Sequence, residues 1–238
     1  MKELLAIGYE NEALYEQALN LAKSLGLPID NEAREKLLVT HDKLVLKMPN
    51  FSPLFCDFSS KTWQKRRDAG KKQGLVRACK PTPGLRILDA TAGWGRDAAV
   101  LASFGADVLM LERQPIIAAL LRDGLERQDA QSKKNLKLKL CAVDALTYLN
   151  SLTPKDFPDV IYMDPMHPQR QKSALVKKDM QALQQLLGVD HDALSLLELA
   201  LTKTLKKVVL KWPQVLAPIL TPTSSVAGNL IRFDIWVK

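Results

Sequence analysis

An Asp-Pro pair after an apolar run is the group in this sequence with the most specific chemistry. Residues 160–163 (VIYM) predict a buried strand, and Asp164 and Pro165 follow it directly. The Asp164 carboxylate and the Pro165 carbonyl can each accept an N–H from an exocyclic amino group, which turns the nitrogen lone pair toward a methyl donor. Since transfer from S-adenosylmethionine (SAM) depends mainly on orientation, we predict that both residues are catalytic through positioning.

A turn of small residues provides a second candidate site. Residues 87–97 (ILDATAGWGRD) predict a strand that ends on Asp89 and passes through Gly93 and Gly95 into a helix. Glycines let the backbone approach a ligand closely, so the turn indicates a nucleotide-like cofactor. Its glycine spacing is shorter than GxGxxG, which makes a nicotinamide oxidoreductase the least favoured alternative.

Acidic residues follow three successive predicted strands. Glu112 ends the second strand and Asp144 follows the third, as Asp89 ends the first. An acid at the end of the second strand can accept hydrogen bonds from both ribose hydroxyls. Each acid alone is explained better as a helix N-cap or a solvated loop end than as a ligand contact. Their common register favours a ligand with a ribose, an amino-bearing base and a cationic tail, and SAM matches this better than NAD.

Positive charge is concentrated in one stretch of the chain. The net charge is +8, and residues 61–80 contain eight Lys and Arg against one Asp, which gives 8 − 1 = +7. Such a stretch would bind a polyanion through counterion release, although a solvated basic helix explains the charge as well. Lys65, Arg66 and Arg67 are therefore candidate contacts to nucleic acid.

Further candidate contacts follow the Asp-Pro pair. His167 could stack on an unstacked base, with a polar loop residue as the alternative. Lys172, Lys177 and Lys178 suit phosphate contacts, although exposed helix faces commonly carry such charges.

The elements that must position these groups alternate along the chain from residue 85. Strands are predicted at 86–90, 107–112, 136–141, 159–164 and 206–211, and helices at 95–104, 115–128, 144–151, 173–187 and 192–204. The strands are apolar on both faces, which is typical of a parallel sheet covered by helices on both sides. The sequence therefore predicts a doubly wound, Rossmann-like α/β fold, in which residues 230–238 form a last strand that could be an antiparallel edge.

Three regions are predicted along the chain. Residues 1–60 are expected to form a small α+β lobe, with strands at 3–9, within 36–48 and at 51–58, and a helix at 10–25 that Gly26 stops. Residues 61–84 are expected to form a basic helix, capped by Ser59 or Ser60, and a linker. Residues 85–238 then form the SAM-dependent methyltransferase domain.

Composition excludes several classes of protein. The chain has 238 residues and is 47% apolar, which is ordinary for a globular protein. No apolar run is long enough to span a bilayer and the N-terminus lacks a signal-peptide pattern, so we expect a cytoplasmic protein. Its three cysteines, Cys56, Cys79 and Cys141, are widely spaced and form no CxxC. We therefore expect reduced thiols and no metal site.

Four segments together resemble the RsmJ family of SAM-dependent methyltransferases. They are residues 89–113, 164–180 (DPMHPQRQKSALVKKDM), 206–213 (KKVVLKWP) and 232–236. The likeness covers nearly all of residues 51–238, and DPM-x-P before QKSALVKK is an unusual sequence. The resemblance implies methylation of the exocyclic N2 of a guanine near the 3′ end of 16S rRNA, in the small ribosomal subunit.

The resemblance also implies cofactor contacts at particular positions. Those are Arg96 and Asp97 after the glycine turn, Glu112 and Arg113 after the second strand, Asp144 and Ala145 after the third, and Asp164. The family often has a pair of serines where this chain has Asp144 and Ala145, and His167 stands in place of a common phenylalanine.

Two other functions remain open at this point. An adenine-N6 methyltransferase of DNA or RNA could use the same Asp-Pro acceptors. A SAM-binding RNA-assembly factor without turnover is the third candidate, but binding alone would not need paired acceptors at Asp164 and Pro165.

Overall fold

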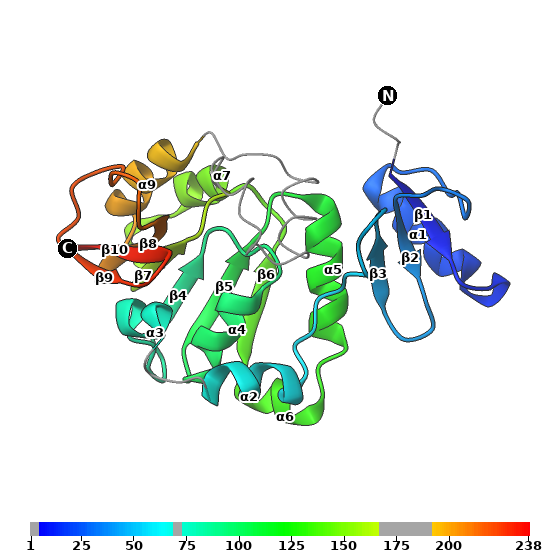
Figure 1. The fold of residues 1–238 in the computed structure, drawn as a ribbon, viewed down its shortest axis with the longest axis horizontal. Helices are drawn as coiled ribbons and strands as arrows, with labels where there is room; N and C mark the ends of the chain where they lie inside the picture. Colours follow the sequence, from blue (N-terminus) through cyan, green and yellow to red (C-terminus); the bar gives the residue numbers. More distant parts are fainter. Residues whose placement is uncertain (1–4, 69–72, 167–191) are drawn as a thin grey trace.

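Seven strands form the larger of two sheets in a computed structural model that describes residues 5–68, 73–166 and 192–238 (Figure 1). The strand order is β6-β5-β4-β7-β8-β10-β9. From β6 to β8 the neighbours are parallel, whereas β10 is antiparallel to both β8 and β9. The strands are β4 (Arg86–Asp89), β5 (Asp107–Leu111), β6 (Lys137–Cys141), β7 (Val160–Met163), β8 (Lys207–Pro213), β9 (Ser224–Ala227) and β10 (Ile231–Val237).

Helices cover both faces of this sheet, which confirms the predicted doubly wound α/β fold. One face packs against α2 (Ser60–Asp68), α3 (Gly74–Cys79), α4 (Arg96–Ser103) and α5 (Pro115–Glu126). The other packs against α7 (Ala145–Ser151) and α9 (Ala193–Thr202). Neighbouring strand residues point to opposite faces, so Ile87 joins the first hydrophobic cluster and Leu88 the second. The short α6 (Ala130–Asn135) was not predicted.

A three-stranded sheet at the N-terminus packs beside α5 (Figure 1). It contains β1 (Ala6–Tyr9), β2 (Lys36–Val39) and β3 (Leu44–Lys47), with the 3₁₀ turn Glu12–Leu14 and α1 (Tyr15–Leu25) between β1 and β2. Gly26 ends α1 with a positive φ of 65°, as predicted. The backbone N–H of Leu44 donates to Asp123 of α5, and the Arg127 guanidinium donates to the Cys56 carbonyl.

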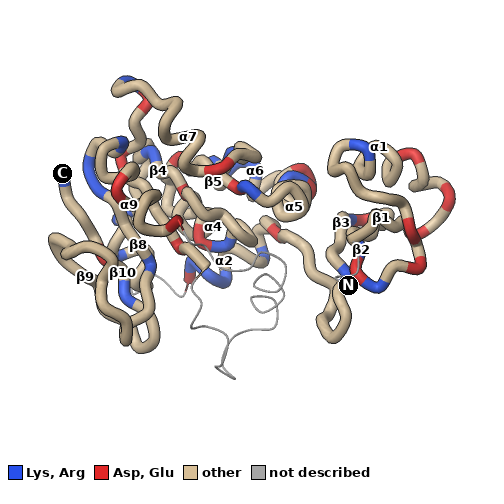
Figure 2. The backbone as a smooth tube through the Cα atoms, turned by 90° about the horizontal axis from the view of Figure 1, so that it is seen from above, with Lys and Arg blue, Asp and Glu red and all other residues tan. Residues whose placement is uncertain are grey.

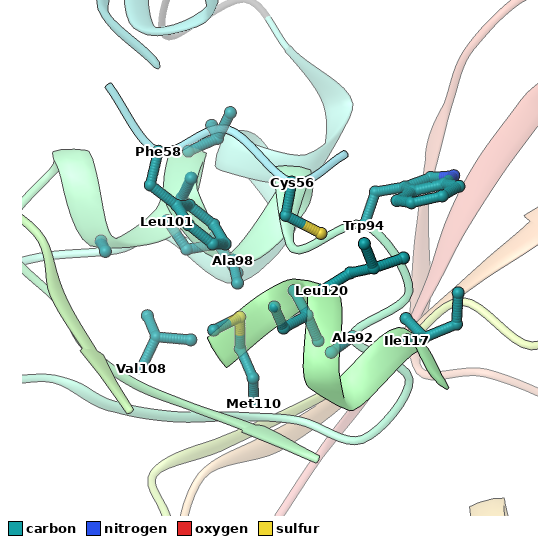
Figure 3. Close-up of a cluster of buried hydrophobic side chains, with 14 of the residues drawn as sticks. Cys56, Phe58, Ala92, Trp94, Ala98, Leu101, Val108, Met110, Ile117 and Leu120 are labelled. Atoms are coloured by element: carbon teal, nitrogen blue, oxygen red, sulfur yellow. The ribbon is translucent and has the colours of Figure 1, made fainter. Parts of the chain in front are cut away.

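The segment between the two sheets contributes to the core of the larger one. Figure 3 shows Cys56 and Phe58 among Ala98 and Leu101 of α4 and Leu120 of α5. One continuous cluster of buried side chains therefore extends from β1 to β10. The division into residues 1–60, 61–84 and 85–238 stays a prediction.

Three predictions about the elements were wrong. Residues 51–58 form only a single bridge, between Leu46 and Leu54, because Pro53 lacks the N–H that a strand ladder needs. The basic stretch contains two helices, α2 and α3, rather than one. The strand β10 is not an edge, since β9 pairs with its outer side. The helix predicted at 173–187 lies outside the described residues.

Bilayer-spanning helices are absent from the described part of the chain.

Candidate functional site

A cavity of about 260 Å³ opens where β4, β5 and β7 end. Ten of the predicted cofactor-binding and catalytic residues line it: Asp89, Gly93, Arg96, Asp97, Glu112, Arg113, Asp144, Ala145, Asp164 and Pro165. Gly95 lies in the turn between two lining residues, Trp94 and Arg96. Carboxyl ends of parallel strands meet at one edge of a sheet, so positions far apart in sequence come together here.

The glycine turn lines this cavity beside the end of β5. Gly93 and Gly95 have positive φ angles of 51° and 68°, which L-residues rarely adopt. The Gly95 N–H donates to the Ala92 carbonyl at 2.8 Å, and the Ala92 N–H donates to the Leu111 carbonyl at 3.1 Å. Figure 3 shows Ala92 and Trp94 of this turn beside Ile117 of α5.

Alanine at Gly95 should destabilise the protein strongly. Its Cβ would lie 2.6 Å from Phe58 Cζ and 2.9 Å from Leu121 Cδ2, in addition to the cost of the left-handed backbone. We expect the free energy of unfolding to fall by about 2–5 kcal/mol, from backbone strain and overpacking together. Denaturant unfolding measures this change.

The matched control is Gly26→Ala, since Gly26 has a similar φ of +65° and no neighbour within 4 Å of the added Cβ. This variant should be destabilised by only about 1–2 kcal/mol, the cost of the left-handed backbone alone. Equal destabilisation at Gly26 and Gly95 would show that contact with Phe58 does not constrain the turn.

Glu112 fixes the glycine turn to the end of β5. It is buried, its Oε2 accepts the Gly93 N–H at 3.1 Å, and its Oε1 accepts the Gln114 N–H at 2.8 Å. Sequence reasoning predicted only a ligand contact for this side chain. Because a carboxylate has about four acceptor positions, these two backbone donors do not by themselves exclude a diol.

Asp144 caps the helix that follows β6. Its Oδ1 accepts the Thr147 N–H at 3.1 Å, at the N-terminus of α7. Asp144 is therefore the helix N-cap that the sequence analysis gave as an alternative, and it also lines the cavity. Arg113 Nη1 lies 3.6 Å from Asp144 Oδ2 and 2.7 Å from Asp192 Oδ2. Asp192 lines the cavity and was not predicted.

A network of charged and hydroxyl side chains surrounds the predicted catalytic carboxylate. Lys211 Nζ donates to Asp164 Oδ2 at 2.6 Å and to Asp97 Oδ2 at 3.1 Å. The Tyr162 hydroxyl donates to the same Asp97 oxygen at 2.6 Å. The backbone N–H of Asp164 donates to Thr91 Oγ1 at 2.6 Å. The carboxylate of Asp164 and its backbone are thus held by separate partners.

Burial and nearby charge have opposite effects on two aspartates of the cavity. Burial raises the pKa of Asp97, but the Lys211 ammonium and the Tyr162 hydroxyl more than offset this, so its pKa lies below the usual range. Burial raises the pKa of Asp89 to about 8. The hydrogen bond from the Thr91 N–H lowers this pKa, and the negative charges of Asp97 and Asp164 raise it. Asp97 is therefore ionised near neutral pH, while Asp89 ionises most readily beside a cation.

Lys211 and its tyrosine and threonine neighbours were missed by sequence reasoning. Lys211 follows the apolar run 208–210 within β8, and a lysine directly after such a run is the signal that could have found it. Its partners come from β7, α4 and the glycine turn, so the cluster depends on the order of the strands.

The predicted nucleic-acid contacts divide into two groups. Arg66 lines the cavity, while Lys65 and Arg67 are exposed on the same helix, α2, which Figure 2 shows beside α4. The buried Trp63 anchors this helix, since its indole N–H donates to Ser132 Oγ at 2.8 Å. The remaining candidates, His167, Lys172, Lys177 and Lys178, lie outside the described residues.

The cysteines take no part in the cavity. Cys56 and Cys79 are free and buried, and burial raises the pKa of both thiols. Over residues 5–68, 73–166 and 192–238, no group of three His, Cys, Asp or Glu could hold a metal ion.

Comparison with known proteins identifies the family. The family model described as "Putative SAM-dependent methyltransferase" matches residues 20–238. A ribosomal RNA small subunit methyltransferase J from Legionella pneumophila (strain Lens) is 57% identical over 237 residues, 100% of this chain and 98% of the relative. The protein of that name from Coxiella burnetii (strain Dugway 5J108-111) is 45% identical over 251 residues, again 100% and 98%.

A solved structure shows the same fold. The crystal structure of a SAM-dependent methyltransferase from Neisseria gonorrhoeae superposes with a TM-score of 0.72 and 28% identity, covering 98% of this chain and 95% of the other. These findings confirm the resemblance found in the sequence and make SAM the methyl donor. The chain belongs to the ribosomal RNA small subunit methyltransferase J (RsmJ) family of SAM-dependent methyltransferases.

Proposed function

We propose that this enzyme methylates the exocyclic N2 of a guanosine in 16S rRNA of the small ribosomal subunit. The observation that carries the proposal is the placement of Asp164. Its carboxylate lines the cavity beside the glycine turn, and its backbone is tied to Thr91 of that turn. An acceptor for an amino group therefore lies next to the region assigned to the cofactor. The substrate follows from the names of the relatives, which are ribosomal RNA small subunit methyltransferases.

The side chains that line the cavity suit SAM by their chemistry. Glu112 would accept the ribose hydroxyls, and the loop of Asp144 and Ala145 would lie at the adenine. Asp89, Asp97 and the glycine turn would hold the amino-acid end, where a cation favours the ionised form of Asp89. The remaining cofactor contacts that we propose are Arg96, Arg113, Gly93 and Gly95. Bound SAM supplies an activated methyl group at this position.

Asp164 and Pro165 would orient the acceptor base. The Asp164 carboxylate and the Pro165 carbonyl each accept one N–H of the amino group, and Asp164 or water takes the proton after transfer. Asp164 is mostly buried, with 15% of its side chain exposed. A hydrogen bond to the amine there would replace less water than at an open surface, and would position the amine more firmly.

Helix α2 would guide the RNA to the cavity. Arg66 lines it and Lys65 and Arg67 lie exposed nearby, so these cations can contact phosphates on either side of the target nucleotide. His167, Lys172, Lys177 and Lys178 are proposed to contribute further contacts. A protein that modifies ribosomal RNA acts in the cytoplasm, which is the location that we propose.

Removing the positive charge of α2 should weaken RNA binding and its dependence on salt. For the Lys65→Ala/Arg66→Ala/Arg67→Ala variant, we expect a shallower slope of log K against log salt. The slope should change by roughly 0.9 for each duplex phosphate that the helix no longer neutralises, and by roughly 0.7 for each phosphate of a single strand. Titration of a labelled 16S rRNA fragment at several salt concentrations measures that slope.

The control removes three exposed cations from the N-terminal lobe, Lys23, Arg34 and Lys47. These residues lie on or near the small sheet, away from the cavity, and the slope should stay close to that of the wild type. An unchanged slope in the α2 variant would support the alternative, in which this helix is a solvated basic surface without a role in RNA binding.

Mass-spectrometric mapping of rRNA from a strain without this protein tests the proposed reaction. We expect one N2-methylguanosine of 16S rRNA to be missing and to return with the wild-type gene. Loss of an N6-methyladenosine instead would support the adenine-N6 alternative. Complete methylation in the deletion strain, together with a ribosome-assembly defect, would support an assembly factor without turnover.

A further inference from the structure

Lys211 lies where the methyl-acceptor and cofactor sides of the cavity meet. Leu210 of β8 pairs with Met163 of β7, so the next residue, Lys211, lies beside Asp164, where β7 ends. Only 18% of its side chain is exposed. Its ammonium contacts Asp164 Oδ2 at 2.6 Å and Asp97 Oδ2 at 3.1 Å, which commits two of its three N–H donors to carboxylates.

Each aspartate in this bridge is held by a second partner, Asp97 through its carboxylate and Asp164 through its backbone. The Tyr162 hydroxyl donates to Asp97 at 2.6 Å, and Thr91 Oγ1 accepts the Asp164 backbone N–H at 2.6 Å. Lys211 therefore holds the Asp164 side chain, while Thr91 holds its main chain. With its side chain and its backbone both held, Asp164 cannot easily turn away from a base in the cavity.

The charge around the bridge gives Lys211 a second effect. Asp97 and Asp164 approach the same ammonium, and Asp89 lies close enough to interact with both. Without the cation, two carboxylates would face each other in a partly buried site, where like charges repel strongly. The Asp164 side chain would then move away from Asp97 or take up a proton. Either change removes the acceptor that the exocyclic amine needs.

We propose that Lys211 is a positioning residue for methyl transfer, which acts through Asp164 and couples it to Asp97. This inference rests on the proposed function, since it assumes that Asp164 accepts the N–H of the target guanine. Lys211 itself needs no contact with the base. Its removal should therefore affect the catalytic step more than the binding of RNA or SAM.

The test compares Lys211→Met with Lys211→Arg on 16S rRNA that lacks the modification. We expect Lys211→Met to lower kcat by roughly 100-fold, as small misplacements of reacting groups do, with KM for RNA and Kd for SAM within about threefold of wild type. Lys211→Arg keeps a cation between the carboxylates and should raise kcat at least about tenfold above that of Lys211→Met.

The matched control is Lys207→Met, at the start of β8, where the ammonium donates to the Ala78 carbonyl outside the cavity. Its kcat per folded molecule should equal that of wild type. If Lys211→Met does not fold, as judged by thermal unfolding, Lys211→Gln replaces it as a neutral variant that retains a hydrogen-bond donor.

Three results would overturn the role of Lys211: an unchanged kcat in the neutral variants, a rise in KM or Kd with kcat preserved, or no recovery with arginine. The activity of the wild-type enzyme distinguishes a failure of this inference from a failure of the proposed function on which it rests. Wild-type enzyme that forms no N2-methylguanosine contradicts the proposed function. An active wild type with an equally active Lys211→Met variant contradicts only the positioning role.

Discussion

Replacement of Asp164 by alanine is expected to lower methyl transfer by roughly 10³-fold or more, with little change in the fold. The variant lacks the carboxylate that we propose orients the exocyclic amine, and positioning groups of this kind contribute on that scale. The Asp164 N–H can still donate to Thr91, and β7 keeps its pairing with β4 and β8. Single-turnover kinetics with labelled SAM measure the decrease.

The control for this variant is Asp159→Ala, just before β7 at its opposite end. Asp159 is also a carboxylate paired with a lysine, Lys206 at 3.1 Å, but it lies away from the cavity. It should leave kcat per folded molecule unchanged, because it alters only the stability of the strand start. Turnover by Asp164→Ala at the wild-type rate would exclude Asp164 from catalysis. The Pro165 carbonyl would then no longer be one of a pair of acceptors for the amine.

Burial on both faces explains why the larger sheet could be predicted well. Its parallel strands are short apolar runs, such as VIYM at 160–163, and the helices between them have clear apolar faces. The strand β9 escaped detection because its sequence, SSVA, is mostly exposed and half polar. Without β9, the buried strand β10 was taken for a possible edge, although its pattern of buried residues on both faces suits an internal strand.

Single residues of the site were predictable where strand ends alone determine their place. Glu112 follows β5 directly and Asp144 comes three residues after the end of β6, so the general location of ligands in α/β sheets was enough to place them at the cavity. The hydrogen bonds within the site were not predictable. The contact between Glu112 and Gly93 depends on how the turn folds back over β5, which the one-dimensional pattern does not contain.

Lys211 illustrates a further limit of sequence reasoning. Its partners Asp164 and Asp97 lie 47 and 114 residues away in the chain. They meet because β8 lies next to β7, and because α4 begins directly after the turn that follows β4. That strand order is a property of the folded sheet. A lysine after an apolar run therefore indicates a site only once the neighbouring strand is known.

Replacement of Glu112 by alanine should have the largest effect on cofactor binding. Two hydrogen bonds from ribose hydroxyls to a buried carboxylate contribute about 1.5–3 kcal/mol each, so the Kd for SAM should rise by at least roughly 100-fold. The variant also leaves the N–H groups of Gly93 and Gln114 without their acceptor, which should lower the free energy of unfolding by about 1–3 kcal/mol. Calorimetric titration and denaturant unfolding measure the two effects separately.

Glu112→Gln and Asp107→Ala separate the ligand contact from the support of the turn. Gln keeps one oxygen for a backbone N–H but removes the charge, so it should retain more stability than alanine while still binding SAM weakly. Asp107 begins β5, pairs with Lys137 at 3.1 Å and lies away from the cavity, so its alanine variant should bind SAM normally. Equal SAM affinity in wild type and in both Glu112 variants would remove Glu112 from the ribose site and leave it as the residue that ties the glycine turn to β5.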